Sequence, residues 1–577
     1  MLTQLRRKSW VAALALGALM AGRAGMPICY AHDTGGGPGE NETTTPIKHV
    51  VVLFQENESF DHYFGTYPHA ANIPGETSWS GVEAPEFKPL PNTPGANGLN
   101  PALLNKNPNK SRTGAQTNPF RLPPSSAVTC DNGHGYGAEQ EAADLGLEDM
   151  YPTFTGGTGE GCLPDGTTVL GYYDGNTVTA LWNYAQHYAM SDNMFGTIYG
   201  PTLPGHINVI SGDTHGGVLY NASSNGAVYI NPSDSSLTLV GNIPAYLDDC
   251  GGTVNTSKAS LELTGKNIGD LLNGSGVTWG WFSGGFKPTT PAAINPDGST
   301  AVPALCGSTH ISHEVTINGV TYVVPNPTTN FTSDVHTVST DYWPSGIEPF
   351  MFYASTRNPH HLPPSSVAAI GRTDQANHQY DTSDFFAALN AGNLPSVSFI
   401  KAPEYEWGHA GNSDPLTEQA WLVQVISAIQ GSRFWRDTAI MIAWDDSDGW
   451  YDHVLAPVIN PSNVSIDHLT GPGSCGTPAA GADEGRCGLG PRLPFLVISP
   501  WAKENYVDHT VIDQSSVIAF IEKNWNLGYI DGPAAPALGT GSADRYAGSI
   551  TSMFDFEDQP HSGSLILDPI TGTLVSE

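Results

Sequence analysis

Residues 47–67 read IKHVVVLFQENESFDHYFGTY, an apolar run that leads straight into polar, charged and ring side chains. The consecutive apolar residues from Val51 to Phe54 are typical of a strand at the centre of a parallel sheet, where both faces are covered. Open α/β sheets bind ligands outside the carboxyl ends of their strands. We therefore expect functional side chains directly after this strand, at Glu56, Asn57, Ser59, Asp61 and His62. The alternative is an ordinary helix N-terminus with Asn57 or Ser59 as its cap.

The chain has 577 residues and a formal net charge of −33. Length alone predicts two to four domains. The 65 glycines and 45 prolines predict many long loops around the core. A surface this acidic excludes binding to nucleic acid or to anionic lipid headgroups through the electrostatic field of the protein.

The N-terminal residues predict export. Residues 1–31 combine a basic cluster at 6–8 with an apolar stretch at 11–20 that is too short to span a bilayer, a pattern typical of a signal peptide. Residues 32–46 are rich in Gly, Thr and Pro and predict a flexible leader. No later stretch has the length and apolar character of a transmembrane segment. We expect a periplasmic or extracellular protein.

Cysteine usage agrees with export. Of the seven cysteines, Cys29 lies inside the predicted signal peptide, and the remaining six form an even set that suits an oxidising compartment. Sequence alone leaves the connectivity open. We predict pairing between neighbours, because each bond would then close one Gly-rich loop: Cys130–Cys162, Cys250–Cys306 and Cys475–Cys487.

Apolar strand-like runs recur along the chain, with helical patterns between them. We expect strands at 48–54, 349–354, 395–401, 438–444 and 493–499, and helices at 414–437, with Asp414 as N-cap, and at 513–526. Alternation of strands and helices predicts an α/β fold with a mostly parallel central sheet.

The domain organisation follows from where this periodicity is lost. Two stretches rich in Gly, Pro, Asn, Ser or Thr lack an obvious core of their own, so we interpret them as loop-rich, partly β insertions. The predicted order is one catalytic domain over 47–530, insertions at about 71–130 and 217–345, and a C-terminal extension over 531–577 packed on the domain.

A second group of polar residues follows the predicted strand 438–444. Residues 444–453 read WDDSDGWYDH, with Asp445 and Asp446 adjacent at the end of the strand. Neighbouring carboxylates repel each other and are costly to bury unless a cation neutralises them. Oxygen ligands favour a hard or borderline cation over a structural zinc ion. The alternative is an Asp-rich turn exposed to solvent.

A hydroxyl group and several histidines complete the candidate chemistry. Residues 199–206 read YGPTLPGH, which presents Thr202 on a rigid Gly/Pro turn in the manner of a nucleophile, although such turns are also common without function. Loop histidines are usually solvated, but those that titrate near neutral pH serve in catalysis. The candidates are His134, His360, His361 and His409. Sequence motifs of α/β-hydrolases, zinc proteases, P-loops and dinucleotide-binding folds are absent.

Six segments, in order, resemble the bacterial phosphoesterase family of acid phosphatases and phospholipases C. They are ENESFDHYFGTYP, GPTLPGHINVISG, NPHHLPP, GHAGNSDPLTEQ, WDDSDGWYDHV and LGPRLPFLVISPWAKENYVDHTVIDQSSVIAFIEKNW. The resemblance runs from about residue 47 to 530 and implies an alkaline-phosphatase-like α/β/α sandwich with one metal ion.

The resemblance also implies roles for individual residues. It makes Glu56, Asn57, Asp445 and Asp446 metal ligands, and it places Thr202 at the nucleophile position beside the metal. His134, His409 and the His360–His361 pair correspond to histidines that contact phosphate or transfer protons. Glu58 departs from the family pattern, where a basic residue is common.

These features predict an exported, metal-dependent acid phosphatase of broad specificity that forms a phosphothreonine intermediate and is most active on the acid side of neutrality. The metal would be one divalent or trivalent ion: Ca, Mg, Mn or Fe before structural Zn. The first alternative is a phospholipase C, in which aromatic residues of the second insertion cage a quaternary ammonium or simply form core: Trp279, Trp281, Phe282 and Trp343. The second is a non-catalytic extracellular binding module. The sequence does not predict the oligomeric state.

Overall fold

The strand predicted at 48–54 is β1 (His49–Gln55), and it lies inside a nine-stranded sheet. The structure is a computed structural model that describes residues 42–159, 161–295, 300–306, 313–317, 320–324, 341–533, 539–561 and 563–576. The predicted signal peptide and most of the predicted leader lie outside these residues. Residues 42–48 lead into β1, whose apolar residues are fully buried.

The central sheet has the order β14-β9-β15-β1-β16-β17-β4-β18, and β19 also pairs with β4. Its strands are β14 (Gln379–Asp381), β9 (Trp279–Ser283), β15 (Val397–Lys401), β16 (Thr438–Trp444), β17 (Arg492–Ile498), β4 (Ala189–Phe195), β18 (Tyr506–Asp508) and β19 (Ile512–Asp513). Only β17 runs against the other strands of this sheet. The predicted α/β fold with a mostly parallel sheet is confirmed, and β1, β15 and β16 end at the same edge.

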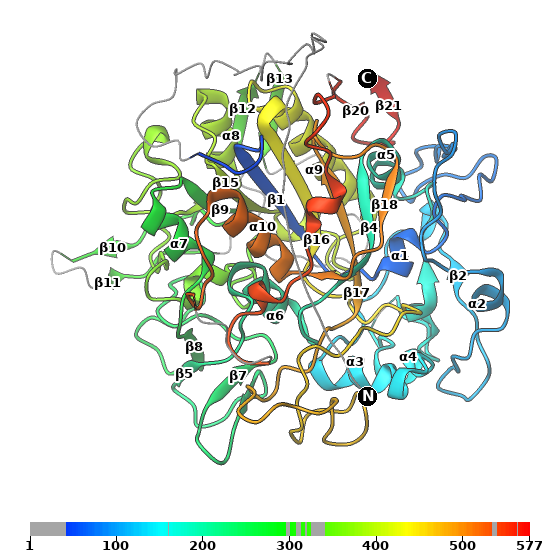
Figure 1. Ribbon diagram of the computed structural model, residues 1–577, viewed down its shortest axis with the longest axis horizontal. Coiled ribbons are helices and arrows are strands. Elements are labelled where there is room, and N and C mark those ends of the chain that lie inside the picture. Colours follow the sequence, from blue (N-terminus) through cyan, green and yellow to red (C-terminus); the bar gives the residue numbers. More distant parts are fainter. Residues whose placement is uncertain are drawn as a thin grey trace, which may run out of the picture. The chain divides into compact units, whose positions relative to one another are not determined.

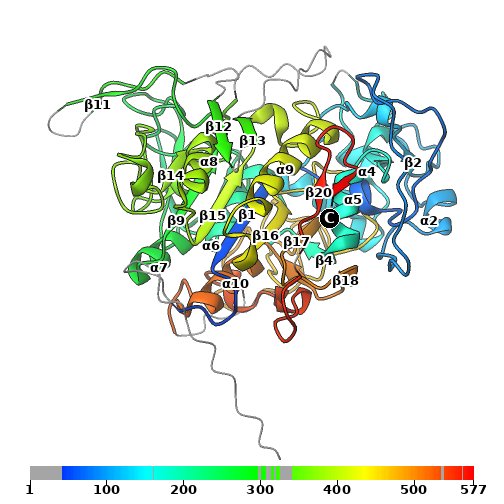
Figure 2. The same ribbon diagram turned by 90° about the horizontal axis from the view of Figure 1, so that it is seen from above.

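Helices cover both faces of the sheet. Figure 2 shows α8 (Thr382–Ala391) and α9 (Pro415–Gln430) on one side of the strands, and α6 (Thr202–Ser211), α7 (Ile268–Ser275) and α10 (Ser515–Trp525) on the other. In Figure 1, β1 runs between β15 and β16 through the middle of the sheet. Covering on both faces explains why these strands read as continuous apolar runs rather than as alternating patterns.

The remaining elements are short. The helices are α1 (Phe60–Phe64), α2 (Pro101–Asn105), α3 (Tyr136–Ala142), α4 (Tyr151–Phe154) and α5 (Thr179–His187). Two-stranded pairs are β2 (Phe120–Arg121) with β3 (Gly171–Tyr172), β5 (Gly217–Tyr220) with β8 (Ser260–Leu263), β6 (Val228–Ile230) with β7 (Leu237–Leu239), β10 (Ala293–Ile294) with β11 (Thr300–Val302), β12 (His313–Ile317) with β13 (Val320–Val324), and β20 (Ile566–Leu567) with β21 (Leu574–Ser576).

Two details of the predicted elements need correction. The segment 349–354, predicted as a strand, begins with a short 3₁₀ helix at Pro349–Phe352, because a brief buried apolar run does not distinguish a strand from a helical turn. The helix predicted to reach residue 437 ends at Gln430, before Gly431. Its predicted cap is confirmed, since the Asp414 side chain accepts hydrogen bonds from the backbone N–H groups of the first turn.

The range 217–345, predicted as an insertion, supplies a strand of the central sheet. β9 lies between β14 and β15, and Trp279, Trp281 and Phe282 within it are fully buried. These three aromatic side chains are therefore core and do not form a ligand cage. Loss of periodicity around the strand concealed it, because a five-residue strand carries little pattern.

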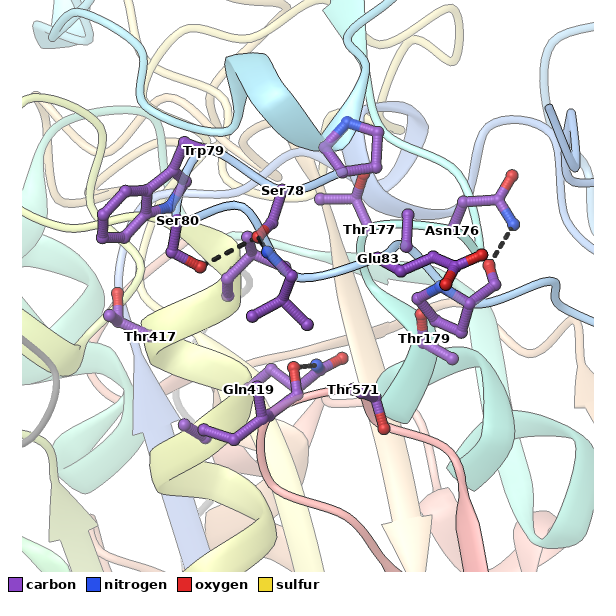
Figure 3. A pocket seen from close by; sticks show the side chains of 17 residues that line it. Ser78, Trp79, Ser80, Glu83, Asn176, Thr177, Thr179, Thr417, Gln419 and Thr571 are labelled. Atoms are coloured by element: carbon purple, nitrogen blue, oxygen red, sulfur yellow. Dashed lines mark hydrogen bonds between the residues drawn. The ribbon is translucent and has the colours of Figure 1, made fainter. Parts of the chain in front are cut away.

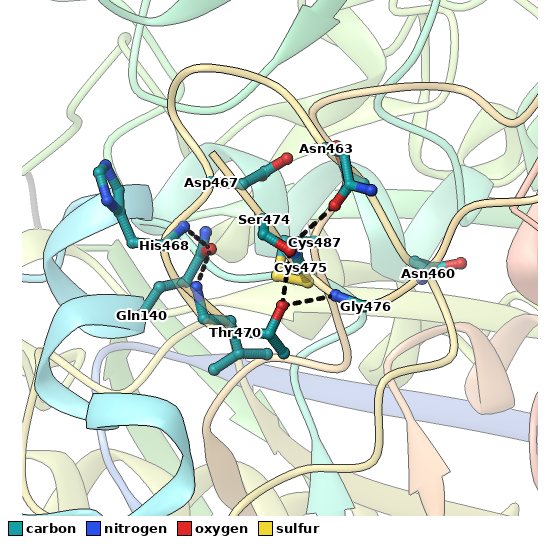
Figure 4. Close-up of a disulfide and its surroundings, with 12 residues drawn as sticks. Gln140, Asn460, Asn463, Asp467, His468, Thr470, Ser474, Cys475, Gly476 and Cys487 are labelled. Carbon is teal, nitrogen blue, oxygen red and sulfur yellow. Dashed lines mark hydrogen bonds between the residues drawn. A yellow bond between two sulfur atoms is a disulfide. The ribbon is translucent and has the colours of Figure 1, made fainter. Parts of the chain in front are cut away.

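The three predicted disulfides are confirmed as Cys130–Cys162, Cys250–Cys306 and Cys475–Cys487. The bond Cys475–Cys487 lies in a loop that hydrogen bonds also hold together, as Figure 4 shows. Gln140 of α3 accepts from the backbone N–H groups of His468 and Leu469, at 2.9 and 3.2 Å. The loop is thereby tied to the helix beside it.

The C-terminal residues contact the domain through both apolar and polar groups. Leu565 and Leu567 belong to the main hydrophobic core. The Asn183 side chain of α5 donates a hydrogen bond to the carbonyl of Gly572 at 2.8 Å. Among the described helices, none combines the length and the apolar character needed to cross a membrane.

Candidate active site

The candidate site is built at the edge where β1, β15 and β16 end. β1 and β16 pair in parallel with Gln55 opposite Trp444, so the next residues of both strands meet. The backbone N–H of Asn57 donates a hydrogen bond to Asp445 Oδ1 at 3.0 Å. Asn57 has a φ of 65°, in the left-handed region that Asn tolerates better than most residues. The structure therefore brings together the two polar segments that the sequence places almost 400 residues apart.

Thr202 lies at the first position of α6, directly over the two ends. Its hydroxyl donates a hydrogen bond to Glu56 Oε2 at 3.3 Å. The helix approaches the end of β16 so closely that a Cβ atom at Gly205 would lie 2.2 Å from the Asp445 carbonyl oxygen. Only glycine permits this contact, and the contact sets the position of Thr202. The predicted turn is thus the N-terminus of a buried helix.

We call Glu56, Asn57, Asp445 and Asp446 the oxygen-donor cluster. All four side chains are buried. In the described part of the chain, three of them have one oxygen without a hydrogen-bond partner, namely Asn57 Oδ1, Asp445 Oδ2 and Asp446 Oδ2, whereas Glu56 Oε1 pairs with the buried Lys401 ammonium. Buried acceptors are normally satisfied, so three unsatisfied oxygens in neighbouring side chains need an explanation. A hard cation accepts oxygen ligands of this kind, and the cluster therefore fits the predicted metal ion.

The raised pKa values of the two aspartates also indicate that this place needs a positive charge. Burial, together with the nearby Glu56 and Asp446 carboxylates, raises the pKa of Asp445 well above its ordinary value. Burial also raises the pKa of Asp446 to about 7. Carboxylates so close to one another in a dry site ionise only with difficulty unless a cation compensates them.

Lys401, the last residue of β15, supplies a positive charge that the sequence analysis did not assign. Its Nζ lies 2.7 Å from Glu56 Oε1, and neither side chain is exposed. Burial alone would raise the pKa of Glu56, but the Lys401 ammonium and nearby histidines hold it below its ordinary value. A lysine at the carboxyl end of a predicted parallel strand was the signal that could have identified it.

His206 is a second unassigned residue, although it belongs to the motif that contains Thr202. One turn after Thr202 on α6, its Nδ1 lies 2.9 Å from the Thr202 carbonyl oxygen and 3.5 Å from Asp445 Oδ2. Burial and the Lys401 charge lower the pKa of His206 to about 3, so the ring is neutral. The spacing of four residues on a helix would have placed it on the same face as the threonine.

His134 and His409 lie together beside the oxygen-donor cluster. Their ring centroids are 5.8 Å apart, and His134 Nε2 lies 3.4 Å from Asn57 Nδ2. On its other side, His134 Nδ1 is 3.0 Å from Asp448 Oδ1. Burial would lower the pKa of His134, but the Asp446 and Asp448 carboxylates raise it well above its ordinary value. The protonated ring can face an anion at the site.

The predicted pair His360 and His361 lies in a different cluster. His360 Nδ1 is 3.2 Å from Asp249 Oδ2, and His361 Nε2 is 2.9 Å from Asp248 Oδ1. Within the described ranges, no hydrogen bond or ion pair joins either histidine to Thr202 or to the oxygen-donor cluster. The nearby Cys250 is in a disulfide, so its thiolate is not available to a metal.

The residues that follow the site residues form a second buried cluster, which contains its own positive charge. We call Asp61, Asp452, His453 and Arg492 the arginine cluster. Arg492 is fully buried, with Nη2 3.0 Å from Asp61 Oδ1 and Nε 3.0 Å from Asp452 Oδ1. His453 Nδ1 lies 2.6 Å from Asp61 Oδ2. These contacts tie α1, which follows Glu56 and Asn57, to the loop that follows Asp445 and Asp446.

A separate cavity of about 210 Å³ lies on another face of α9, between the loop around Trp79 and the C-terminal Thr571 (Figure 3). Gln419 lines this cavity and accepts a hydrogen bond from the backbone N–H of Ala180 at 2.8 Å. None of the predicted site residues is among the residues that line it.

Comparison with known proteins agrees with this geometry. The sequence profile of the Phosphoesterase family matches residues 47–528. The chain belongs to this family. The family predicted from the sequence motifs is confirmed, and hydrolysis of phosphoric esters is confirmed as the chemistry of the family.

The relatives are named as phospholipases C. Phospholipase C A and Phospholipase C B of Mycobacterium tuberculosis are 22% and 23% identical to the chain over 540 and 573 residues. These alignments cover 92% and 96% of this chain and 81% and 86% of the relatives. A Non-hemolytic phospholipase C of Burkholderia pseudomallei is 36% identical over 168 residues. That match spans 29% of this chain and 23% of the Burkholderia protein, less than a quarter of its length.

Proposed function

We propose that this protein is a metal-dependent phosphoric-ester hydrolase that uses Thr202 as its nucleophile. The observation that carries the proposal is the Thr202 hydroxyl, which lies 3.3 Å from Glu56 Oε2 beside the unpartnered oxygens of Asn57, Asp445 and Asp446. A sheet with helices on both faces, and a site at the ends of its parallel strands, also supports the alkaline-phosphatase-like classification.

The oxygen-donor cluster and the Thr202 hydroxyl would hold one divalent or trivalent ion. A set made only of oxygens suits Ca, Mg, Mn or Fe better than structural Zn. When bound, such an ion supplies positive charge that lowers the pKa of a neighbouring hydroxyl and offsets charge on a phosphoryl group. Lys401 holds the Glu56 carboxylate in its ionised form, ready to act as a ligand.

The reaction then proceeds in two displacements. Thr202 Oγ1 gives up its proton and forms a bond to phosphorus while the ester P–O bond breaks, and the departing alcohol oxygen takes up a proton. Water next attacks the phosphothreonine, the bond between phosphorus and Oγ1 breaks, the threonine hydroxyl regains its proton, and phosphate or a phosphorylated headgroup departs. The protonated His134, with His409 beside it, contacts the phosphoryl oxygens as their charge is redistributed. The roles of His360 and His361 stay predictions.

Two substrate classes fit this chemistry. The sequence motifs favour phosphomonoesters and hence an exported acid phosphatase. The names of the relatives favour phospholipids and hence a phospholipase C. Burial of Trp279, Trp281 and Phe282 removes most of the proposed cage for a quaternary ammonium. Trp343 remains and is half-buried. A Cβ atom at Gly346 would lie 2.8 Å from Trp343 Cζ3 and 3.2 Å from the Thr202 methyl carbon, so Trp343 lies near the proposed nucleophile.

A substrate panel tests the proposal and separates these classes. The purified protein is assayed with p-nitrophenyl phosphate, p-nitrophenylphosphorylcholine and phosphatidylcholine vesicles, with and without chelator, beside Thr202→Ala. We expect hydrolysis that chelator abolishes, a loss of at least about 1000-fold in Thr202→Ala, and a phosphorylated peptide containing Thr202 after acid quenching.

Activity of Thr202→Ala within tenfold of the parent protein would refute the nucleophile. Activity that rises steadily above pH 8 would contradict the predicted acid-side maximum, because His134 must be protonated to face phosphate. No turnover of any of the three substrates would favour the non-catalytic binding module.

A further inference from the structure

Glu418 is a fully buried acid on α9 to which neither the sequence motifs nor the proposed reaction gives a role. It lies in the first turn of the helix, whose N-terminus Asp414 caps and whose apolar side chains are packed into the core. Its carboxyl group leaves the helix toward the ends of β1 and β16. A charged group is rarely buried in this way unless several donors satisfy it.

Three side chains donate hydrogen bonds to this one carboxyl group. Oε1 accepts from Gln55 Nε2 at 3.3 Å and from Trp444 Nε1 at 3.1 Å. Oε2 accepts from the Tyr63 hydroxyl at 2.7 Å. Gln55 directly precedes Glu56, and Trp444 directly precedes Asp445. Glu418 therefore connects the last residues before both halves of the oxygen-donor cluster.

The same carboxyl group also lies under the turn that carries His409. Gly408 has a φ of +97°, and a Cβ atom there would lie 2.9 Å from Glu418 Cδ and 3.1 Å from both carboxyl oxygens. A larger residue would be excluded by both its backbone conformation and this contact. The backbone N–H of Glu56 donates to the Trp407 carbonyl oxygen at 3.0 Å, which joins this turn directly to the end of β1.

We propose that Glu418 is a positioning residue that fixes the ends of β1 and β16 and the Gly408 turn relative to one another, so that Glu56, Asp445 and His409 meet at one site. The inference rests on the proposed function for its catalytic meaning, but its structural content does not. A rigid helix supplies the anchor, and outer hydrogen bonds of this kind are what orient metal ligands in proteins.

The test compares Glu418→Ala, Glu418→Gln and the adjacent Gln419→Ala in the full-length protein. Gln419 is equally buried and also accepts one hydrogen bond, but it faces the cavity of Figure 3. It is thus a control for the loss of a buried polar side chain on the same turn. The first readout is amide hydrogen exchange of metal-free protein, followed in peptides that span 53–58, 405–410 and 442–447. The second is affinity for Mn²⁺, measured by the electron paramagnetic resonance of the free ion.

Glu418→Ala should exchange at least about tenfold faster in all three peptides and bind Mn²⁺ about 10 to 100-fold more weakly. Glu418→Gln keeps an acceptor for Gln55 and Trp444, so its exchange rates and its Mn²⁺ affinity should differ from those of the parent protein by about fivefold or less. Gln419→Ala should stay within twofold of the parent protein in both readouts. Equal exchange rates in Glu418→Ala and Gln419→Ala would overturn the inference.

The outcomes for the inference and for the proposed function remain distinguishable. If the parent protein turns over no phosphoric ester while Glu418→Ala shows fast exchange only in the three peptides, the proposed function fails and the positioning role stands. If the parent protein is an active hydrolase and Glu418→Ala keeps its Mn²⁺ affinity and slow exchange, the function stands and the positioning role fails.

Discussion

The oxygen-donor cluster and the arginine cluster are neighbours, and both take their acids from the same two segments. They differ in whether a protein cation compensates the buried acids. Each cluster takes acids from the chain after β1 and from the chain after β16. In the arginine cluster, Arg492 contacts both Asp61 and Asp452 at 3.0 Å. In the oxygen-donor cluster, Lys401 compensates Glu56 alone, and three oxygens have no hydrogen-bond partner within the described residues. One cluster is complete without a ligand, and the other is not.

This difference indicates that the arginine cluster is structural and that the oxygen-donor cluster is the candidate functional site. A buried acid with a fixed cation stabilises the arrangement it belongs to, provided that its geometry is good. A buried acid without one costs stability and is retained where a function requires it. The arginine cluster thereby holds the two segments together while the oxygen-donor cluster keeps its carboxylates available to a cation. Substitutions in the two clusters should have effects of opposite sign.

The largest effect is expected for Arg492→Met, which leaves Asp61 and Asp452 buried without their cation. The free energy of unfolding should fall by about 3 to 5 kcal/mol, measured by urea denaturation of metal-free protein. Arg121→Met, which breaks a more exposed contact with Glu76 and Asp174, should cost only about 1 kcal/mol. Equal losses in the two variants would show that the arginine cluster has no special role.

Acid should destabilise the scaffold through His62, which follows Asp61 on α1. Burial lowers the pKa of His62 from 6.5 to about 3, so only the unfolded chain binds the proton between these values. The contribution of His62 is present above pH 6.5 and is lost as the pH falls toward 3, at up to about 1.4 kcal/mol per pH unit. Urea denaturation at pH 7.0 and 4.5 should differ by about 2 kcal/mol more in the parent protein than in His62→Asn.

The asparagine in His62→Asn keeps a donor for the Gly171 carbonyl oxygen, to which His62 Nδ1 is hydrogen-bonded at 2.7 Å. His69→Asn, at an exposed histidine, serves as the control and should keep the pH dependence of the parent protein. A pH dependence in His62→Asn as steep as that of the parent would assign the acid sensitivity to other groups.

In the oxygen-donor cluster, Asp446→Asn should stabilise the metal-free protein, the opposite of the result for Arg492→Met. Removing one of several crowded carboxylates relieves repulsion, so the free energy of unfolding at pH 7.5 should rise by about 2 kcal/mol. The same variant should lose most of the stabilisation that added Mn²⁺ gives the parent protein. Asp452→Asn, made in the arginine cluster, should be destabilised in the same assay.

The smallest effect is expected for Lys401→Met, which removes the fixed cation beside Glu56. Without this charge burial raises the pKa of Glu56, so the carboxyl group can take up a proton instead of remaining a buried anion, and the metal-free protein should lose only about 1 to 2 kcal/mol of stability. The stabilisation that a bound metal ion gives the variant should increase, because the positive charge of Lys401 no longer repels the ion. Thermal shift with increasing Mn²⁺ measures both changes. Lys48→Met, at a partly exposed lysine that contacts Thr43, should leave both unchanged.

Much of the site could be predicted because its residues directly follow buried strands. Parallel strands end at one edge of a sheet, so the residues after 48–54 and after 438–444 were expected at the same edge. The structure adds that the two strands are neighbours, which brings Glu56 and Asp445 together. Thr202, His134 and His409 also lie at or beside this edge. The pairing of cysteines was predictable for a similar local reason, since each disulfide closes a short loop.

Other features depend on contacts between distant segments. His360 and His361 lie within hydrogen-bond distance of Asp249 and Asp248, more than 100 residues away, and no local pattern reveals these contacts. β9 could not be assigned from five residues in an irregular stretch. Arg492 is the first residue of a buried strand, where its charge would argue against burial. Two acids and two backbone carbonyl oxygens from distant parts of the chain satisfy it there.

The sequence by itself determined the α/β class, the family, and the identity of the polar residues at the strand ends, because these follow from periodicity and short motifs. The tertiary structure decided which of those acids receive a fixed cation and which remain open to a metal ion. The reason is geometric. Charge compensation needs a donor nitrogen and a carboxylate oxygen within about 3 Å, and only the folded chain brings Arg492 and Lys401 to their acidic partners.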